Sequence, residues 1–211
     1  EADDRLLAGL GRPRCGHLDV SGAPPFDHVS PVSSSPITCG TSGRTRGLFG
    51  QTDGSVVSHT GDVLSVENGS IEHLTCMVKG YVATTDNGLA VGRTETGEQC
   101  WSSEGAPVAA QTEAMEHEGA SLLWLARAEG AGSSVHVWAT NQGGMVASGT
   151  FPKVRSMDGT AERAVVGCED GSVHVWDRTM LQRRLANQAA PSEGVDERTS
   201  ALQAKLRALR R

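Results

Sequence analysis

The feature that most constrains the fold is a segment near the C-terminus in which two strand-like runs flank an Asp-Gly pair. The segment spans residues 163–177 and reads RAVVGCEDGSVHVWD. Asp-Gly between two such runs is a strong signal for a β-hairpin, because Gly adopts positive φ without steric cost. Along the second run, valines alternate with His174 and Trp176, so the two sets point to opposite faces of a strand. The segment predicts a tight hairpin that closes on Trp-Asp.

The same hairpin pattern recurs at three earlier places in the chain. Residues 53–56 repeat the Asp-Gly-Ser-Val of residues 170–173, and a second copy turns through Asn-Gly, where Asn also tolerates positive φ. The third copy repeats Ser-Val-His-Val-Trp at residues 134–138. The positions that correspond to Trp176 are spaced by 34, 45 and 38 residues and are His59, Arg93 and Trp138. A four-stranded propeller blade takes roughly 40 to 45 residues.

These hairpins and their spacing resemble the WD-repeat (WD40) β-propeller family over residues 28–185. The resemblance implies an all-β fold of four-stranded antiparallel blades. About four blades are visible, which makes a partial or open propeller, with an α-helix at the C-terminus. The residues that carry the structural blade motif are Asp53, Gly54, Asn87, Gly88, Trp138, Asp170, Gly171, Trp176 and Asp177.

Most of the polar residues in these hairpins are interpreted as parts of the frame. A carboxylate at the start of a turn, such as Asp53 or Asp170, is expected to accept hydrogen bonds from backbone N–H groups of the turn. The family resemblance implies a buried polar network around this aspartate, with His28 as a partner in the first copy. His136 and His174 could act in metal or acid–base chemistry, but their repetition favours a structural role.

The two ends of the chain differ from the repeats. Residues 1–27 predict little regular structure, apart from a short helix over Ala2–Leu10, although Gly16-His17 looks like the Gly-His pair that opens a WD repeat. Residues 186–211 predict a linker and a helix that begins at Ser192 and carries an apolar stripe with a basic C-terminal end. Three alternatives stay open for this segment, which are docking a partner helix, packing on its own propeller and forming a frayed tail. The small number of blades and the start at Glu1 favour a fragment, or a propeller that a partner completes.

Composition restricts the function classes. The net charge of −6 argues against a nucleic-acid-binding or membrane-surface protein, and no apolar run approaches the ~20 residues that span a bilayer. None of the five cysteines lies in a C-x-x-C pair, so the sequence predicts neither a zinc site nor a disulfide framework. We expect these cysteines to be mostly buried thiols in a reducing compartment. They are Cys15, Cys39, Cys76, Cys100 and Cys168.

No catalytic, metal or cofactor motif is recognised, and no cofactor is expected. A polar cluster could bind a cation, but we favour an exposed loop between blades; it consists of Glu113, Glu116, His117 and Glu118. The WD-repeat resemblance implies a non-enzymatic scaffold or adaptor of an intracellular complex, cytoplasmic or nuclear. Its propeller loops would bind other proteins, and neither nucleic acid nor membrane. A more specific alternative is the substrate-recognition subunit of a ubiquitin ligase, because the chain looks a little like the C-terminal half of an F-box/WD-repeat protein. The competing class is an enzyme on a propeller scaffold.

Overall fold

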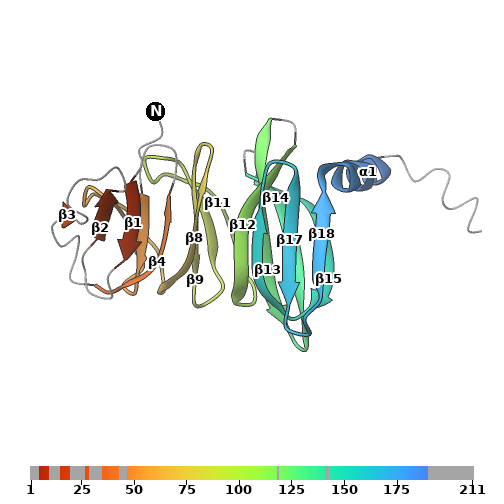
Figure 1. Ribbon diagram of the computed structural model, residues 1–211, viewed down its shortest axis with the longest axis horizontal. Coiled ribbons are helices and arrows are strands. Elements are labelled where there is room, and N and C mark those ends of the chain that lie inside the picture. Colours follow the sequence, from red (N-terminus) through yellow and green to blue (C-terminus); the bar gives the residue numbers. More distant parts are fainter. Residues whose placement is uncertain are drawn as a thin grey trace, which may run out of the picture. The chain divides into compact units, whose positions relative to one another are not determined.

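The computed structural model describes residues 5–9, 15–19, 27–28, 35–42, 47–117, 119–140 and 143–189. These residues form β-strands and one helix, which Figure 1 labels in chain order. The chain divides into two compact units between Trp176 and Asp177. No helix in the described part is long and apolar enough to cross a membrane.

The first unit contains five antiparallel sheets, each made of strands that follow one another along the chain. The first sheet has three strands, β1 (Arg5–Gly9), β2 (Cys15–Asp19) and β3 (Asp27–His28). The second sheet has four strands, β4 (Ile37–Ser42), β5 (Gly47–Gln51), β6 (Ser55–Ser58) and β7 (Val63–Val66). The third has β8 (Ile71–Met77), β9 (Gly80–Thr85), β10 (Ala90–Arg93) and β11 (Gln99–Ser103).

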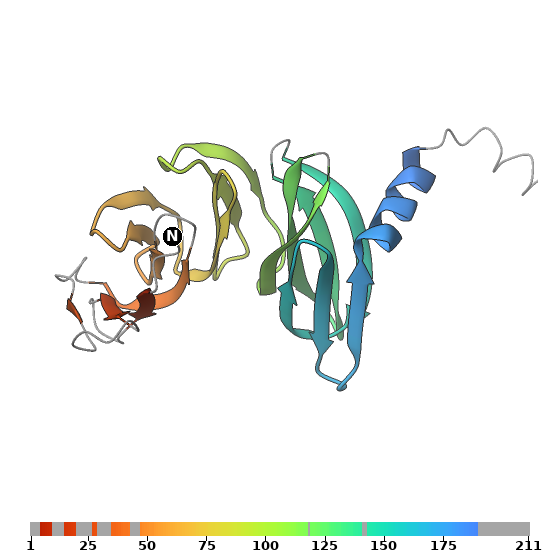
Figure 2. The same cartoon turned by 45° about the horizontal axis from the view of Figure 1, so that its top comes forward.

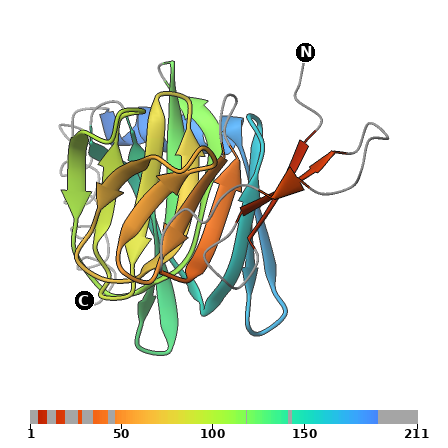
Figure 3. The same cartoon turned by 90° about the vertical axis from the view of Figure 1, so that its left-hand side faces the viewer.

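The fourth and fifth sheets follow the same order. The fourth has β12 (Val108–His117), β13 (Ala120–Glu129), β14 (Gly132–Ala139) and β15 (Gly144–Pro152). The fifth, which we call the last sheet, has β16 (Val154–Gly159), β17 (Arg163–Cys168) and β18 (Val173–Asp177). Figure 3 shows the up-and-down course of the strands in the orange and yellow sheets.

The all-β blade fold predicted from the sequence is confirmed. The four predicted hairpins are β5–β6, β9–β10, β13–β14 and β17–β18, which are the second and third strands of their sheets. The predicted glycines Gly54, Gly88 and Gly171 have φ of 86°, 85° and 84°, in the left-handed region that favours glycine. The outer strands of the third and fourth sheets are β11 and β15.

Neighbouring sheets contact each other mainly through their first strands. Strand β1 contacts β4, β4 contacts β8, β8 contacts β12, and β12 contacts β16. Leu48 and Val56 of the second sheet share a buried cluster with Ile71, Leu74 and Tyr81 of the third. Burial of apolar side chains therefore holds these two sheets together. Figure 2 shows the sheets following one another in chain order, from red to blue.

The N-terminal expectations differ from the structure in three respects. Arg5–Gly9 forms strand β1 rather than a helix, because it pairs with Cys15–Asp19. A three-stranded sheet therefore precedes the four predicted blades, and Gly16-His17 lies in its second strand. Residue 28, where the predicted repeats begin, ends β3 of this first sheet, and the first strand of the next sheet is β4.

At the other end, helix α1 (Arg178–Ala189) follows β18 directly. Asp177 caps this helix, because its Oδ1 accepts a hydrogen bond from the backbone N–H of Met180 at 2.8 Å and another from the Thr179 hydroxyl. Leu181–Leu185, which the sequence assigned to the propeller, lies in α1. The helix predicted from Ser192 falls outside the described residues, and the domain limits 28–185 and 186–211 stay predictions.

Candidate functional site

The predicted turn residues act within their own hairpins. Asp53 Oδ1 accepts a hydrogen bond from the Ser55 backbone N–H at 2.9 Å. Asp170 Oδ1 accepts from the N–H and the hydroxyl of Ser172, at 2.9 and 2.6 Å. In the third sheet, the Asn87 side chain accepts from the Leu89 N–H and donates to the Asn68 carbonyl oxygen. Each side chain thus fastens the turn that it starts, as the sequence predicts.

The buried network that the family resemblance implies is not formed around Asp170. Its carboxylate is exposed, and the hydrogen bonds found for it stay within the turn. The hydroxyl and the N–H of Ser172 lower the pKa of Asp170. The side chain of His28 lies outside the described residues. The nine residues of the predicted blade motif are spread over four sheets, so they form no common site.

The two predicted tryptophans pack between sheets. Trp138 stacks on Trp101 of the preceding sheet, with ring centroids 5.5 Å apart and an interplanar angle of 1°. Trp176 meets Trp124 edge to face at 5.9 Å. Both pairs bury aromatic area where one sheet meets the next, which is a structural role.

The position that corresponds to Trp176 in the third sheet holds Arg93, whose role sequence reasoning missed. Its guanidinium donates to both carboxylate oxygens of the buried Glu67, at 2.5 and 2.8 Å, and to the Gly97 carbonyl oxygen. The hydrogen bonds to Glu67 raise the pKa of Arg93. A bidentate ion pair therefore joins the third sheet to the end of the second sheet, at the position where aromatic packing joins the later sheets.

A second missed residue is Arg127, on β13. Its side chain is buried, and it donates to the carbonyl oxygens of Gly88, Ala106 and Ser103 at 2.7, 2.7 and 3.1 Å. Burial lowers the pKa of this guanidinium. Arg127 therefore ties the β9–β10 turn and the β11–β12 connection to the fourth sheet. A lone arginine inside an apolar run, Leu-Leu-Trp-Leu-Ala-Arg, was the signal that could have found it.

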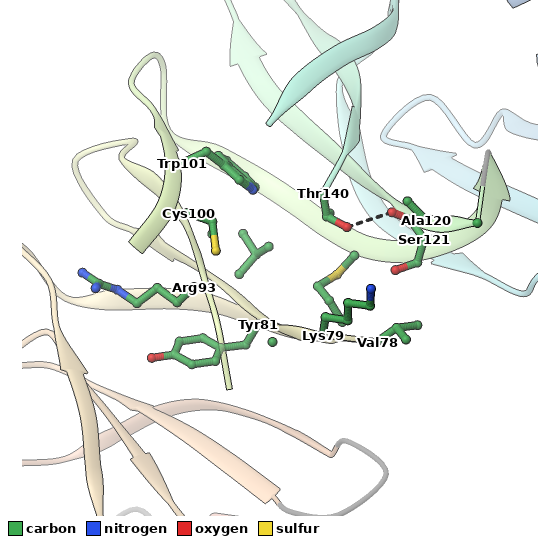
Figure 4. A pocket seen from close by; sticks show the side chains of 14 residues that line it. Val78, Lys79, Tyr81, Arg93, Cys100, Trp101, Ala120, Ser121 and Thr140 are labelled. Atoms are coloured by element: carbon green, nitrogen blue, oxygen red, sulfur yellow. Dashed lines mark hydrogen bonds between the residues drawn. The ribbon is translucent and has the colours of Figure 1, made fainter. Parts of the chain in front are cut away.

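One hollow of about 100 Å³ opens between the third and fourth sheets, and we call it the inter-sheet hollow. Figure 4 shows Trp101 and Cys100 on one side of it, Ser121 and Thr140 on the other, and Val78 with Lys79 at its edge. The Thr140 hydroxyl donates to the Ser121 carbonyl oxygen at 3.0 Å. Five turn or strand segments contribute, so no single stretch of sequence could have predicted the hollow.

The position of the Trp101 indole requires a glycine at residue 92, against which the ring packs. A Cβ placed on Gly92 would lie 2.2 Å from the Trp101 Nε1, closer than any side chain allows. Val78 and Lys79 are exposed, and so is Cys100. The hollow thus offers an aromatic ring, an aliphatic side chain and a cationic amine together. Of these three, aromatic side chains such as Trp101 are the ones enriched in protein interfaces.

A second hollow, of about 430 Å³, lies where the first strands of four sheets end. Its lining includes Ser42, Val78, Glu113, Glu116 and Thr160. The predicted loop around Glu113 is wrong, because Glu113, Glu116 and His117 belong to strand β12. A β-bulge between Glu113 and Glu116 disrupts the pairing there, and Met115 within it has a φ of 64°. Glu118 lies outside the described residues.

The remaining polar candidates give no catalytic or metal centre. No group of three His, Cys, Asp or Glu within the described ranges could hold a metal ion. His136 is half-buried, and burial lowers its pKa, with a further lowering from the charge of Arg127. Of the cysteines whose side chains are described, Cys39, Cys100 and Cys168 are free thiols. Cys168 is buried, Cys39 and Cys76 are half-buried, and Cys100 is exposed. The expectation of mostly buried thiols is therefore only partly met. Burial raises the pKa of Cys39 to about 11.

Comparison with known proteins decides the fold. A chain of the mitotic checkpoint complex superposes with a TM-score of 0.69 at 14% identity, covering 82% of this chain and 57% of that one. The WD40 β-propeller domain of Doa1 gives 0.62 at 15% identity, covering 83% and 61%. This chain has a β-propeller fold. BBS1N, crystallised in complex with ARL6DN, gives 0.65 at 15% identity, covering 81% and 60%.

The similarity extends to the fold alone, because each identity is below 25%. No family profile matches the sequence, and no curated protein matches it. The chain spans about 60% of the length of the first structures that it matches. The predicted likeness to WD40 propellers is supported at the level of the fold, whereas the F-box likeness finds no support among these structures.

Proposed function

We propose that this protein is a non-enzymatic interaction scaffold that binds other proteins through one end of its sheets. The observation that carries the proposal is the inter-sheet hollow, where Trp101, Lys79 and Val78 lie together. Aromatic and aliphatic side chains beside a cation favour a protein segment as ligand, since aromatic residues are enriched in protein interfaces. BBS1N was crystallised with a protein partner, which supports the same use of this fold.

Two features of the hollow favour binding of a chain rather than catalysis. Its rigid walls come from neighbouring sheets, and the exposed side chains Val78 and Lys79 lie on the turn between β8 and β9. Turns on a rigid frame are the usual carriers of binding residues. The stacked ring of Trp138 supports Trp101 from behind, so Trp101 keeps its orientation without a ligand.

We also infer an intracellular protein. The free thiols of Cys39, Cys100 and Cys168 fit a reducing compartment. Labelling of these thiols in intact cells, compared with the purified chain reduced beforehand, tests this inference. Disulfide-bonded cysteines in the cellular protein would contradict it.

The test of the scaffold proposal is quantitative affinity capture with two matched variants. The double variant Val78→Glu/Lys79→Glu reverses the chemistry of the turn at the hollow, whereas Val66→Glu places a single carboxylate on the outer strand β7. We expect the wild type and Val66→Glu to capture the same proteins in stoichiometric amounts, and the double variant to lose them. Circular dichroism checks that all three are folded.

Two results would contradict the proposal. One is capture of no stoichiometric protein by the wild type. The other is capture by the double variant that equals the wild type, because the hollow would then lie outside the binding surface.

A further inference from the structure

Two hollows of the molecule adjoin at the end of strand β8. The inter-sheet hollow and the second hollow, of about 430 Å³, share Met77, Val78 and Ser121 as lining residues. Val78 is 49% exposed and lies on the turn that joins β8 to β9. We call the two hollows together the end groove. Its lining extends from the outer strand β11, which carries Trp101, to the first strands β8, β12 and β16.

The β11 end of the end groove is positively charged. Its lining among the described residues contains two cations, Lys79 and Arg93, and no carboxylate. Arg93 is paired with Glu67, and Figure 4 shows its guanidinium turned away from the hollow. Lys79 is exposed, and the ion pairs found among the described residues do not include it. The charge available to a ligand at this end is therefore the Lys79 ammonium.

The other end of the end groove is negatively charged. Glu113 and Glu116 line the second hollow, whose described lining contains no cation. Residues three apart on a regular strand point to opposite faces, but the bulge at Met115 lies between these two. The bulge therefore allows both glutamates to line one hollow. Glu113 is half-buried and Glu116 is exposed, and neither belongs to an ion pair found in the described part of the chain.

Between the two charged ends the groove offers an apolar surface of suitable length. Met77, Val78 and Trp101 contribute to it, and tryptophan is enriched among the residues that contribute most to protein binding. Neighbouring strands lie about 4.8 Å apart and an extended chain rises about 3.3 Å per residue, so about four or five extended residues reach from β11 to β8. The groove therefore fits a short extended segment.

We propose that the end groove binds a short extended segment of a partner protein with an acidic residue at one end, an apolar residue in the middle and a basic residue at the other end. The acidic residue pairs with Lys79, and the apolar residue packs on Trp101 and Val78. The basic residue pairs with Glu113 and Glu116. Complementary charges at both ends fix the order of the segment in the groove. The inference rests on the proposed scaffold function, because it names the kind of segment that the scaffold binds.

Selection of random phage-displayed peptides of about 12 residues, with the full chain as bait, tests this inference, since such peptides exceed the length of the groove. We expect the enriched peptides to contain an acidic, an apolar and a basic residue in this order or its reverse. Fluorescence anisotropy then measures the affinity of one enriched peptide for the wild type and for charge-reversed variants.

Lys79→Glu should bind the enriched peptide at least about tenfold more weakly, because an attraction between charges becomes a repulsion. Replacing the acidic residue of the peptide with Lys should restore the affinity for this variant. Glu116→Lys should weaken binding in the same way, and replacing the basic residue of the peptide with Glu should restore it. Both effects should diminish as the salt concentration rises.

Lys153→Glu and Glu104→Lys are the matched controls, because they make the same changes of charge outside the lining of the end groove. Glu104 lies in the connection between β11 and β12. Lys153 pairs with Glu169 at the surface, a contact that contributes little to stability. Both controls should bind the peptide like the wild type. All four substituted positions are exposed, so the variants should fold, and circular dichroism verifies this.

The possible failures distinguish this inference from the scaffold function. Enriched peptides without this charge pattern overturn the inference, as does binding that Lys79→Glu and Glu116→Lys leave unchanged or that the replaced peptides do not restore. If the wild type captures stoichiometric proteins but enriches no peptide, the inference fails and the scaffold function stands. A groove already filled by another segment of the chain gives that same result. Capture of neither proteins nor peptides overturns both.

Discussion

Strands β14 and β18 share the residues Val-His-Val-Trp in the same order and have opposite surroundings. In β14 the valines of Ser-Val-His-Val-Trp are buried, and in β18 they are more than half exposed. The tryptophans face the preceding sheet in both strands, Trp138 on Trp101 and Trp176 on Trp124. The sequence therefore determines the strand and the direction of its side chains, whereas the neighbouring sheet determines whether a face is buried. Three pairs of variants and one single variant test this difference.

The largest effect on stability is expected from a charge at the second valine of Val-His-Val-Trp, which is Val137 in β14 and Val175 in β18. Val137→Asp places a carboxylate where the side chain is 3% exposed, which should lower the free energy of unfolding by at least ~4 kcal/mol. Val175→Asp should change it by less than ~0.5 kcal/mol in the monomer, because that side chain is in water. Urea denaturation at low micromolar concentration measures both. Equal losses would mean that the two strands have the same surroundings.

Removing the aromatic rings should have a smaller effect of the same kind. Trp124 is 1% exposed, and its Nε1 donates to the Ala114 carbonyl oxygen at 3.2 Å, so Trp124→Ala should cost about 4 kcal/mol. Trp176 is half-buried and contacts Trp124 from the last sheet, so Trp176→Ala should cost about 2 kcal/mol. Chemical denaturation gives both values. A larger loss for Trp176→Ala would contradict the burial assigned to the last sheet.

The hairpins were predictable because their signals are local. Asp53-Gly54, Asn87-Gly88 and Asp170-Gly171 each specify a turn whose two strands are adjacent in sequence. Strand β1 escaped prediction because Arg5–Gly9 gains its identity from pairing with Cys15–Asp19, and neither run alternates clearly. Helix α1 had a readable signal that was missed: Asp177 precedes a run with neither Gly nor Pro, RTMLQRRLANQA.

The candidate site was less predictable than the fold. Val78 and Lys79 come from one turn, Trp101 from an outer strand and Thr140 from the next sheet, so only packing of two sheets brings them together. Burial of Arg127 depends likewise on carbonyl groups 21 to 39 residues away in sequence. The residues expected to form a loop pair with β13 instead, so they belong to the long first strand β12, which has a bulge at Met115. Local patterns carry no information on these contacts.

The corresponding histidines His136 of β14 and His174 of β18 extend the comparison to the pH dependence of stability. Burial first, and then the positive charge of Arg127, lower the pKa of His136 below its ordinary value of 6.5. The unfolded chain takes up that proton more readily than the folded one. The contribution of neutral His136 to stability is therefore complete above about pH 6.5 and is lost as the pH falls through the lower folded pKa.

His136→Gln should accordingly reduce the fall in melting temperature between about pH 7 and pH 5. His174→Gln is the matched control at the corresponding position of β18. Thermal unfolding across this pH range measures both variants. A pH dependence in His136→Gln that equals the wild type would show that protonation of this ring does not limit stability.

The smallest effect should come from the turns that precede the two strands. The β17–β18 turn has Asp170 within it, whereas the β13–β14 turn runs through Gly130-Ala131 and has its carboxylate on the flanking Glu129, which accepts from the Ser134 hydroxyl at 2.7 Å. The hydroxyl and N–H of Ser172 lower the pKa of Asp170, so the contribution of this carboxylate to stability is present above the ordinary carboxyl pKa and is lost as the pH falls through the lower folded value.

Because the Asp170 carboxylate is fully exposed, Asp170→Asn should leave the global melting temperature nearly unchanged and speed amide exchange only locally. The amide of Cys168, which donates to the Ser172 carbonyl oxygen at 2.9 Å, should report that change at neutral pH and not below the folded pKa. Amide exchange followed by NMR at both pH values checks it, and faster exchange spread over β14 as well would contradict a local role for this turn.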